Sequence, residues 1–423
     1  MTTDVLNVSL SLSPILKIPV GRLALDGNIA IFEYDGTFST SGLGINPTFG
    51  AIGPGLVRPR DRGAFRGLHG VFADSLPDSW GQLLLERRLR QAGVALHGLT
   101  VLDRLAYVGR RGRGALVYEP STDEATADRE VNLDRLALEA DEVLEGDENE
   151  VLRRLEELGG SSGGARPKVH VALDSAGRAF AGEGNLPPGF TNWIVKFHAS
   201  ADRFVDIGPL ETAYAEAARR AGIDMPRTRL ISSLRGPGYF ATERFDRGAD
   251  GRRFHVLSVA AMLDADWTVP SIDYDSLLSV VRSVTRDEQA VLQMFRRMVF
   301  NVLALNRDDH TKQHAFILDH EGRWRLSPAY DLTLSSGPGN EHYLAVNGRA
   351  RSITRRDILA VAGEQLIDAP RANAVLDEVA AAVALLPSIA RDFGVTRATL
   401  AETKRATEDQ LSLLASFKTS GTQ

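Results

Sequence analysis

The chain has 423 residues, 43% of them hydrophobic and 25% charged, which is typical of a globular protein of two or three domains. Its formal net charge is −6, so it lacks the global basic field that marks a nucleic-acid binder. It contains no cysteine, which excludes disulfides, thiolate metal sites and cysteine nucleophiles and fits a cytoplasmic protein.

The N-terminal region, residues 1–120, is expected to be a small strand-rich domain. Residues 1–19 lack a basic start and a long apolar core, so no signal peptide is expected. Nowhere does the chain approach an uninterrupted apolar stretch of about eighteen residues, so no membrane span is expected either. The patterns along this domain predict strands at residues 21–25, 29–34 and 115–118. They predict a helix at residues 78–92.

The next segment, residues 121–158, is strongly acidic. Its acidic side chains cluster in the second half, at Asp141, Glu142, Glu145, Asp147, Glu148 and Glu150. A charge run of this kind favours a solvated helical linker between domains, and an acidic patch that docks a partner is the alternative.

A change from strands to helices organises the rest of the chain. The patterns predict strands at 169–173, 193–197 and 238–245 and a helix at 210–221. Further on the chain is mostly helical and includes a long helix that leads into Asn306. This order predicts an α+β fold with two lobes, like that of a protein kinase. Residues 159–250 would be the ATP-binding part of the core, and residues 251–423 the helical C-terminal lobe with the catalytic loop.

The run from Asn306 to Gln313 carries the clearest chemistry. Arg307-Asp308, with an amide side chain five residues after the aspartate, has the spacing of a kinase catalytic loop. Asp308 would accept a hydrogen bond from the substrate hydroxyl group and finally its proton. Gln313 and Asp331 would be oxygen ligands of Mg²⁺. Kinases have asparagine at the position of Gln313, and the longer side chain brings its carbonyl group to a different point.

Phosphate binding requires backbone N–H groups and cationic side chains. The stretch 159–168 is rich in glycine and serine and ends at Lys168, but it is neither a Walker A motif nor the protein-kinase glycine motif. Lys196 resembles the strand lysine of kinases, and Glu211 opens the next helix, where it could pair with Lys196. Taken singly, these features also fit a flexible linker, a solvated lysine and an acid at a helix N-terminus.

The same loop has a rival interpretation as a metallohydrolase site. His310 and His314 are four residues apart, and several aspartates are near them in sequence. However, Thr311 stands where the H-E-x-x-H motif requires glutamate, and the loop follows a helix rather than lying on one. We therefore favour ATP-dependent phosphotransfer, because the kinase-like features occur together and in the kinase order.

The chain resembles a known family over most of its length, from about Leu16 to Leu414. It looks like the HipA-like serine/threonine kinases, which are toxins of bacterial type II toxin–antitoxin systems. The stretches that carry the resemblance are 72–81, 161–168, 243–247, 306–313 and 327–332. The first of them looks like the small N-terminal subdomain of the family, so residues 1–120 are expected to be a HipA-like N-terminal subdomain.

The resemblance implies a serine/threonine protein kinase with ATP and Mg²⁺ as cofactors. Asp308 would be the catalytic aspartate, and Gln313 and Asp331 would be the metal ligands. The residues implied to bind ATP are Gly163, Gly164, Ala165, Arg166, Pro167, Lys168, Lys196, Glu243, Arg244, Phe245, His310, Thr311, Lys312, Gln313, Tyr330 and Asp331. The family has asparagine where this chain has Gln313. That difference motivates one alternative, a nucleotide-binding pseudokinase that serves as a co-repressor with a DNA-binding antitoxin.

The resemblance also implies regulation and partners. Family members can silence themselves by autophosphorylation, and Ser161 matches the modified serine, with Ser162 beside it. A phosphoserine there would add about −1.5 to −2 charges and repel ATP. The implied substrate is an aminoacyl-tRNA synthetase, with glutamyl-tRNA synthetase the best-known case. The implied partner is a helix-turn-helix, HipB-like antitoxin, through which the chain would meet DNA indirectly; no membrane partner is expected.

Overall fold

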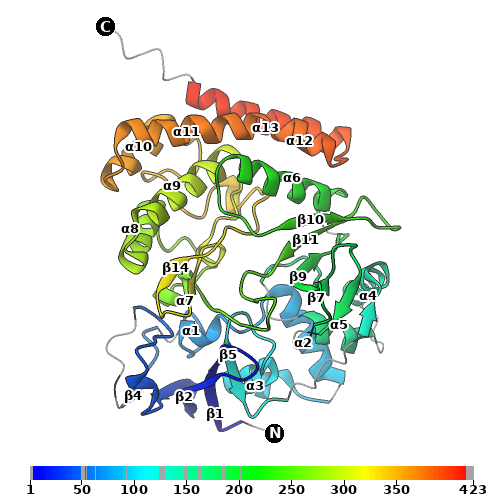
Figure 1. The fold of residues 1–423 in the computed structure, drawn as a ribbon, viewed down its shortest axis with the longest axis vertical. Coiled ribbons are helices and arrows are strands. Elements are labelled where there is room, and N and C mark those ends of the chain that lie inside the picture. The colour runs from blue at the N-terminus through cyan, green and yellow to red at the C-terminus, as the bar shows by residue number, and fades with distance from the viewer. Residues whose placement is uncertain are drawn as a thin grey trace.

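The computed structural model describes residues 3–48, 53, 55–61, 63–91, 93–122, 129–146, 151–159, 163–182, 186–200 and 202–415. Ser161 and Ser162, the expected autophosphorylation sites, lie outside these residues. Within the described part, the strands form three sheets. In Figure 1 the N-terminal strands lie at the bottom of the view and the last helices of the chain at the top, with the other elements between them.

The first sheet builds the N-terminal domain, with the strand order β4-β3-β2-β1-β5 and antiparallel neighbours. A β-carbon on Gly21 would lie 2.2 Å from the carbonyl oxygen of Glu33, so this close approach of β2 to β3 requires glycine. The three strands predicted for this domain correspond to β2, β3 and β5. The elements of the domain are β1 (Val5–Ser11), β2 (Lys17–Asp26), β3 (Ile29–Tyr34), β4 (Leu56–Val57), α1 (Gly70–Ala73), α3 (Val101–Val108) and β5 (Leu116–Glu119).

The second sheet has the order β10-β11-β9-β7-β8-β6, again with antiparallel neighbours. Because successive side chains of a strand point to opposite faces, each central strand presents one apolar row and one mixed row. Trp193 and Val195 lie in a buried apolar core on one face, while Ile194 and Lys196 line a cavity on the other. The strands are β6 (Arg129–Val131), β7 (Lys168–Leu173), β8 (Ala179–Ala181), β9 (Thr191–Lys196), β10 (Thr228–Ile231) and β11 (Tyr239–Glu243).

The apolar core of the second sheet also contains side chains of α2 (Ser79–Gln91), α4 (Leu133–Glu145) and α5 (Val151–Gly159). The helix predicted at 78–92 is therefore α2, and it joins the N-terminal domain to the second sheet. The acidic segment does more than link two domains, since it supplies β6, α4 and α5 and buries five apolar side chains of α4: Leu133, Leu136, Ala137, Ala140 and Val143. Of its clustered acidic residues, three lie outside the described residues: Asp147, Glu148 and Glu150.

The C-terminal lobe is mostly helical, as predicted. The long helix before the catalytic loop is α9, and it buries the apolar stripe that includes Val291, Phe295 and Val302. The two strands after the loop, β13 and β14, form a small antiparallel sheet with β12, which precedes α7 in the chain. The elements are α6 (Ile207–Arg220), β12 (His255–Ser258), α7 (Val259–Leu263), α8 (Tyr274–Thr285), α9 (Glu288–Leu303), β13 (Ala315–Leu318), β14 (Trp324–Leu326), α10 (Arg355–Glu364), α11 (Ala369–Ala384), α12 (Leu386–Asp392) and α13 (Arg397–Ala415).

One apolar stretch of this lobe, Ala369–Asp392, comprises α11 and α12. Its length, and the mean hydropathy of 1.5 of an 18-residue window within it, would by themselves allow it to cross a membrane. In the fold, α11 packs against α6 and α9, and α12 packs against α6 and α13. Its apolar side chains thus contribute to the core of the lobe, which is the usual reason for such a composition in a globular domain.

Buried histidines predict an acid-sensitive fold. Burial lowers the pKa of His255 to about 4, and His255 donates a hydrogen bond from Nε2 to the carbonyl oxygen of Ile45 (2.8 Å). Since the unfolded chain takes up this proton near pH 6.5, stability is expected to fall as the pH falls from 6.5 to 4, by about 3 kcal/mol for this residue. Urea unfolding at pH 7, 6 and 5 measures this, and His255→Gln, which keeps a donor, is expected to flatten the dependence. Equal pH dependence of the variant and the unaltered chain would contradict it.

Candidate active site

A cavity of about 300 Å³ lies between the second sheet and the C-terminal lobe. One wall of the cavity is the row of side chains that face away from the apolar core of the sheet, among them Lys168, Ile194, Lys196 and Phe240. The opposite wall comes from the loop between α9 and β13 and from the segment around Asp331. The fold thus brings together the two halves of the predicted site, whose nearest members, Phe245 and Asp308, are 63 residues apart in the sequence.

Lys196 is the centre of the charged cluster in this cavity. Its Nζ donates to Oε1 of Glu211 at 2.6 Å and also to Oδ1 of Asp331. Glu211 lies in α6 and is only 1% exposed. Burial disfavours the charged form of Lys196, but Asp331 and Glu211 outweigh it and raise the pKa of the lysine. The pairing of Lys196 with Glu211 that the sequence suggested is therefore present.

Asp331 is held in an unusual backbone conformation. Its φ of 57° lies in the left-handed region, which costs energy for a residue with a β-carbon and is found preferentially at functional sites. Burial would raise the pKa of its carboxyl group, but the charges of Lys196 and Lys168 outweigh burial and hold that pKa well below its usual range. Asp331 is consequently a carboxylate at any pH near neutrality.

Asp308 lies on the cavity wall opposite the sheet. Its backbone N–H donates to Oγ of Ser335 (2.7 Å), and half of its side-chain surface is exposed. Partial burial of the carboxyl group and the negative charge of Asp331 raise the pKa of Asp308 to about 7. His310 lies beside it, with Nε2 3.6 Å from Oδ1, but burial lowers the pKa of His310 to about 4, so this contact joins a neutral imidazole to the carboxyl group. A carboxyl group with this pKa can take up a proton near pH 7.

Gln313 lies beside both aspartates. Its Nε2 donates to Oδ2 of Asp331 (3.1 Å). The hard oxygen donors at this point suit Mg²⁺, which typically takes one or two carboxylates and completes its shell with water and phosphate oxygens. Among the described residues there is no cluster of three or more histidine and acidic side chains that could hold an ion by itself. The residues present therefore fit Mg²⁺ together with a phosphate ligand, provided that the amide of Gln313 turns its oxygen toward the ion.

The described part of the glycine-rich stretch, residues 163–168, closes one end of the cavity. Gly164 has a φ of 99°, and a β-carbon on it would lie 2.8 Å from Nζ of Lys168, so the turn requires glycine. Nζ of Lys168 donates to the carbonyl oxygen of Gly163. Burial and the neighbouring charge of Lys196 lower the pKa of Lys168 to about 8. Gly163, Gly164, Ala165 and Lys168 line the cavity.

Three of the predicted nucleotide-binding residues are not among the described residues that line the cavity: Arg166, Pro167 and Thr311. Arg166 donates from Nη1 to Oε2 of Glu211 (2.5 Å), so it binds the same carboxylate as Lys196 but from the other side. The carbonyl oxygen of Pro167 accepts a hydrogen bond from the backbone N–H of Phe197 (2.8 Å). Thr311 is buried beneath the loop. These three residues lie outside the cavity lining and contact residues next to it.

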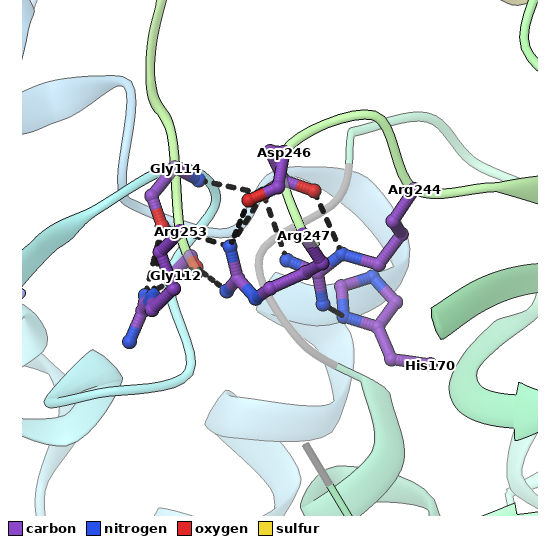
Figure 2. A network of polar contacts seen from close by, with 7 residues as sticks. All are labelled: Gly112, Gly114, His170, Arg244, Asp246, Arg247 and Arg253. Carbon is purple, nitrogen blue, oxygen red and sulfur yellow. Dashed lines mark hydrogen bonds and ion pairs between the residues drawn. The ribbon is translucent and has the colours of Figure 1, made fainter. Parts of the chain in front are cut away.

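The segment from Glu243 to Phe245, which is implied to bind ATP and is called the hinge from here on, lines the cavity, but its arginine has a structural role as well. Arg244 is buried, and its guanidinium group donates to both carboxylate oxygens of Asp246 (2.9 Å each) and to Nδ1 of His170 (2.9 Å). Figure 2 shows this arrangement, with the carboxylate of Asp246 between the guanidinium groups of Arg244 and Arg247. The guanidinium group thereby fixes the chain just after β11.

The same network reaches the N-terminal domain. Oδ2 of Asp246 accepts hydrogen bonds from the backbone N–H of Gly114 and from Nη1 of Arg247 (2.8 Å each). Arg247 also donates to the carbonyl oxygens of Gly112 (3.0 Å) and Gly114 (2.9 Å), and Arg253 donates to Gly114 (Figure 2). The loop before β5 is thus bound to the chain that follows the hinge.

Several cavity residues were not predicted from the sequence as site residues: Asp74, Asp78, Ser79, Arg113, His170, Met225, Pro226 and Trp267. Arg113 lies over the rings of Tyr330 (4.9 Å) and Phe245 (5.8 Å), and Nζ of Lys312 lies over the ring of Trp267 (5.1 Å). Asp74, Asp78 and Ser79 come from the stretch 72–81. The resemblance of that stretch to the family was the one sequence signal that could have identified them.

The rival metallohydrolase interpretation requires His310 and His314 to face a common ion. His310 lines the cavity, whereas His314 is buried and packs edge-on against Tyr274 at a centroid distance of 6.1 Å. The two imidazoles therefore have different surroundings. His314 is the packed residue that its position beside β13 suggests.

The two-lobed α+β fold, with a lysine, a glutamate and two aspartates converging on a cavity between the lobes, defines a protein of the kinase-like class. A family model for the HipA N-terminal domain matches residues 15–119, and one for the HipA-like C-terminal domain matches residues 160–386. The chain belongs to the HipA-like family, which confirms the resemblance of its motifs.

Two known proteins illustrate the likeness. HipA of Shewanella oneidensis MR-1, solved in a complex with HipB and its operator DNA, is 18% identical and has a TM-score of 0.71, covering 97% of this chain and 98% of that chain. This likeness shows the common fold. A Sinorhizobium fredii protein named "Putative kinase Y4dM" is 28% identical over 157 residues, which span 33% of this chain and 37% of that protein. The chain thus matches little more than a third of the length of this curated relative.

Proposed function

We propose that the chain is an ATP-dependent serine/threonine protein kinase that acts in the cytoplasm as the toxin of a type II toxin–antitoxin system. The observation that carries the proposal is the position of Lys196, bonded to both Glu211 and Asp331 within the cavity that also contains Asp308. In kinases a strand lysine paired with a helix glutamate holds the α- and β-phosphates, and an aspartate beside it holds the metal.

Each side chain has a defined part in the proposed reaction. Lys196 would bind the phosphates of ATP, and Glu211 would keep the ammonium group oriented. Asp308 would accept the proton of the serine or threonine hydroxyl group. The oxygen of that hydroxyl group would form the new bond to the γ-phosphorus while the bond between the γ-phosphorus and the oxygen of ADP breaks. Mg²⁺, held by Asp331 with Gln313, would supply charge neutralisation on the phosphates. The glycine-rich stretch would contribute backbone N–H groups.

For the substrate, we propose an aminoacyl-tRNA synthetase, with glutamyl-tRNA synthetase the first to test. We also propose that autophosphorylation at Ser161 or Ser162 inactivates the kinase, since a phosphate there would bring negative charge to the end of the cavity that Lys168 closes. The partner we propose is a helix-turn-helix, HipB-like antitoxin that makes the contact with DNA. The solved complex of the Shewanella HipA with HipB and operator DNA supports this partner.

A mass-spectrometric experiment tests the activity. Incubation of the purified chain with Mg²⁺ and ATP is expected to add one phosphate to the peptide that contains Ser161 and Ser162, and to add phosphate to glutamyl-tRNA synthetase when that protein is present. The Ser161→Ala and Ser162→Ala variants identify the modified serine. If neither the chain nor the synthetase gains phosphate, while the antitoxin-free chain is folded by circular dichroism, the proposed activity is wrong.

One observation favours a second candidate, a nucleotide-binding pseudokinase that acts as a co-repressor with a DNA-binding antitoxin. The amide nitrogen of Gln313 donates a hydrogen bond to Oδ2 of Asp331, so it occupies an oxygen of the carboxylate that a metal would need. Calorimetric titration with Mg²⁺ and ATP separates the two candidates. Tight binding without phosphate on the chain or on the synthetase supports the co-repressor, and transfer supports the kinase.

A further inference from the structure

Asp78 connects three parts of the molecule at the mouth of the cavity. It lies just before α2, and its two carboxylate oxygens bind two distant segments. Oδ1 accepts a hydrogen bond from the backbone N–H of Gly164 (2.8 Å), and Oδ2 accepts one from Nζ of Lys312 (3.0 Å). The side chains of Asp78 and Lys312 are only 15% and 17% exposed, so solvent and salt screen this ion pair much less than a surface pair.

The backbone around Asp78 is shaped for this contact. A β-carbon on Gly163 would lie 2.9 Å from Oδ2 of Asp78, so glycine is required for the carboxylate to come this close. The second residue of α2, Trp80, donates from its backbone N–H to the carbonyl oxygen of Gly164 (3.4 Å) and from Nε1 to that of Lys168 (3.1 Å). The start of α2 therefore binds the described glycine-rich stretch at both of its ends.

The charge on Asp78 is maintained by Lys312. Burial alone would raise the pKa of the Asp78 carboxyl group, but the charge and hydrogen bond of Lys312 and the N–H of Gly164 outweigh it and lower that pKa. Lys312 also lines the cavity, with Asp308 and Gln313. A polyphosphate in the cavity would attract the ammonium group of Lys312 and repel the carboxylate of Asp78, so the ligand and Asp78 compete for the same lysine.

We propose that Asp78 is a latch: a positioning residue that ties residues 163–168 to Lys312 in the ligand-free protein and yields Lys312 to the phosphates of a bound nucleotide. The N-terminal domain thereby controls access to the nucleotide site and the freedom of the glycine-rich stretch. The identity of the ligand rests on the proposed function, whereas the tie to Gly164 belongs to the ligand-free chain and can be tested without activity.

Two substitutions separate the two bonds of the latch. Asp78→Asn keeps an oxygen for the N–H of Gly164 but removes the charge that competes for Lys312. It is expected to bind the Mg²⁺ complex of a non-hydrolysable ATP analogue about tenfold more tightly in calorimetry, with normal exchange of the amides of residues 163–168. Asp78→Ala removes both bonds and is expected to speed hydrogen–deuterium exchange at these amides in the full-length, ligand-free chain, by about tenfold or more.

The controls use the same chemistry elsewhere. Asp26→Asn removes an exposed ion pair of the N-terminal domain, with Arg58 (2.8 Å), and is expected to change neither readout. In a Lys312→Met background, Asp78→Asn is expected to lose most of its effect on affinity, because its competitor is gone. Unchanged or weaker analogue binding by Asp78→Asn overturns the latch. If the unaltered chain binds no analogue, the proposed function fails, and the hydrogen–deuterium exchange result alone decides whether the latch exists. Equal exchange in Asp78→Ala and in the unaltered chain then overturns the latch.

Discussion

Asp308→Asn is expected to lower the rate of phosphate transfer by about 10²–10⁴-fold while leaving nucleotide affinity nearly unchanged. Asparagine preserves the shape of the side chain but cannot take up the proton of the acceptor hydroxyl group. The carboxyl group lies on the loop wall of the cavity, half exposed, so its neutralisation should disturb packing little. Single-turnover transfer of the γ-phosphate to the chain measures the rate, and calorimetry with a non-hydrolysable analogue measures the affinity.

Asp287→Asn is the matched control for this substitution. Asp287 accepts a hydrogen bond from the backbone N–H of Gln289 (2.8 Å) at the N-terminus of α9, and asparagine is an equally good residue at this position. This variant should transfer phosphate at the normal rate. Transfer by Asp308→Asn within about threefold of the unaltered chain would show that Asp308 is not the proton acceptor.

The parts of the site that could be predicted are those determined by local sequence. The spacing within the run from Arg307 to Gln313 fixes a loop between α9 and β13, and the alternation along β9 sends Lys196 to the face opposite Trp193. The pairing of Glu211 with Lys196 could be predicted because the helix that carries Glu211 follows that strand directly. Such inferences need only the period of a strand or a helix and the order of elements.

The residues that escaped prediction depend on tertiary packing. Asp78 and Arg113 lie in a domain that precedes the sheet by many residues, and only the docking of that domain brings them to the cavity. Arg166 lies within a phosphate-binding pattern, but Glu211 offers it a buried carboxylate, and this ion pair turns the guanidinium group away from the cavity. The sequence contains no sign of this competition, because a guanidinium group binds phosphate and carboxylate equally well.

Gln313 stands where kinases have asparagine, and the structure shows how the site accommodates its longer side chain. The sequence raised the question of where the longer side chain would bring its amide. In the structure the amide nitrogen donates a hydrogen bond to Oδ2 of Asp331 at 3.1 Å. The longer side chain therefore reaches the carboxylate that is predicted to bind the metal, and this contact is the one that a metal must replace.

Asp246→Ala is expected to lower the free energy of unfolding by about 3–5 kcal/mol, the usual cost of removing one partner from a buried ionic network. Asp246 is 4% exposed, and the charges of Arg244 and Arg247 outweigh its burial and hold its pKa well below the usual range. Without the carboxylate, two buried guanidinium groups lose their counter-charge, and the N–H of Gly114 loses its acceptor. Urea unfolding followed by circular dichroism and by tryptophan fluorescence measures the loss.

The network also connects stability with the site, because Arg244 precedes Phe245 in the cavity lining and Gly114 follows Arg113. Asp246→Ala is therefore expected to loosen the docking of the N-terminal domain before the C-terminal helices unfold, so the two probes should give separate transitions. Asp250→Ala, four residues later, removes an exposed carboxylate paired with Arg252 and should unfold like the unaltered chain. If both variants unfold alike, the N-terminal domain is held by its apolar core, and the buried network adds little to it.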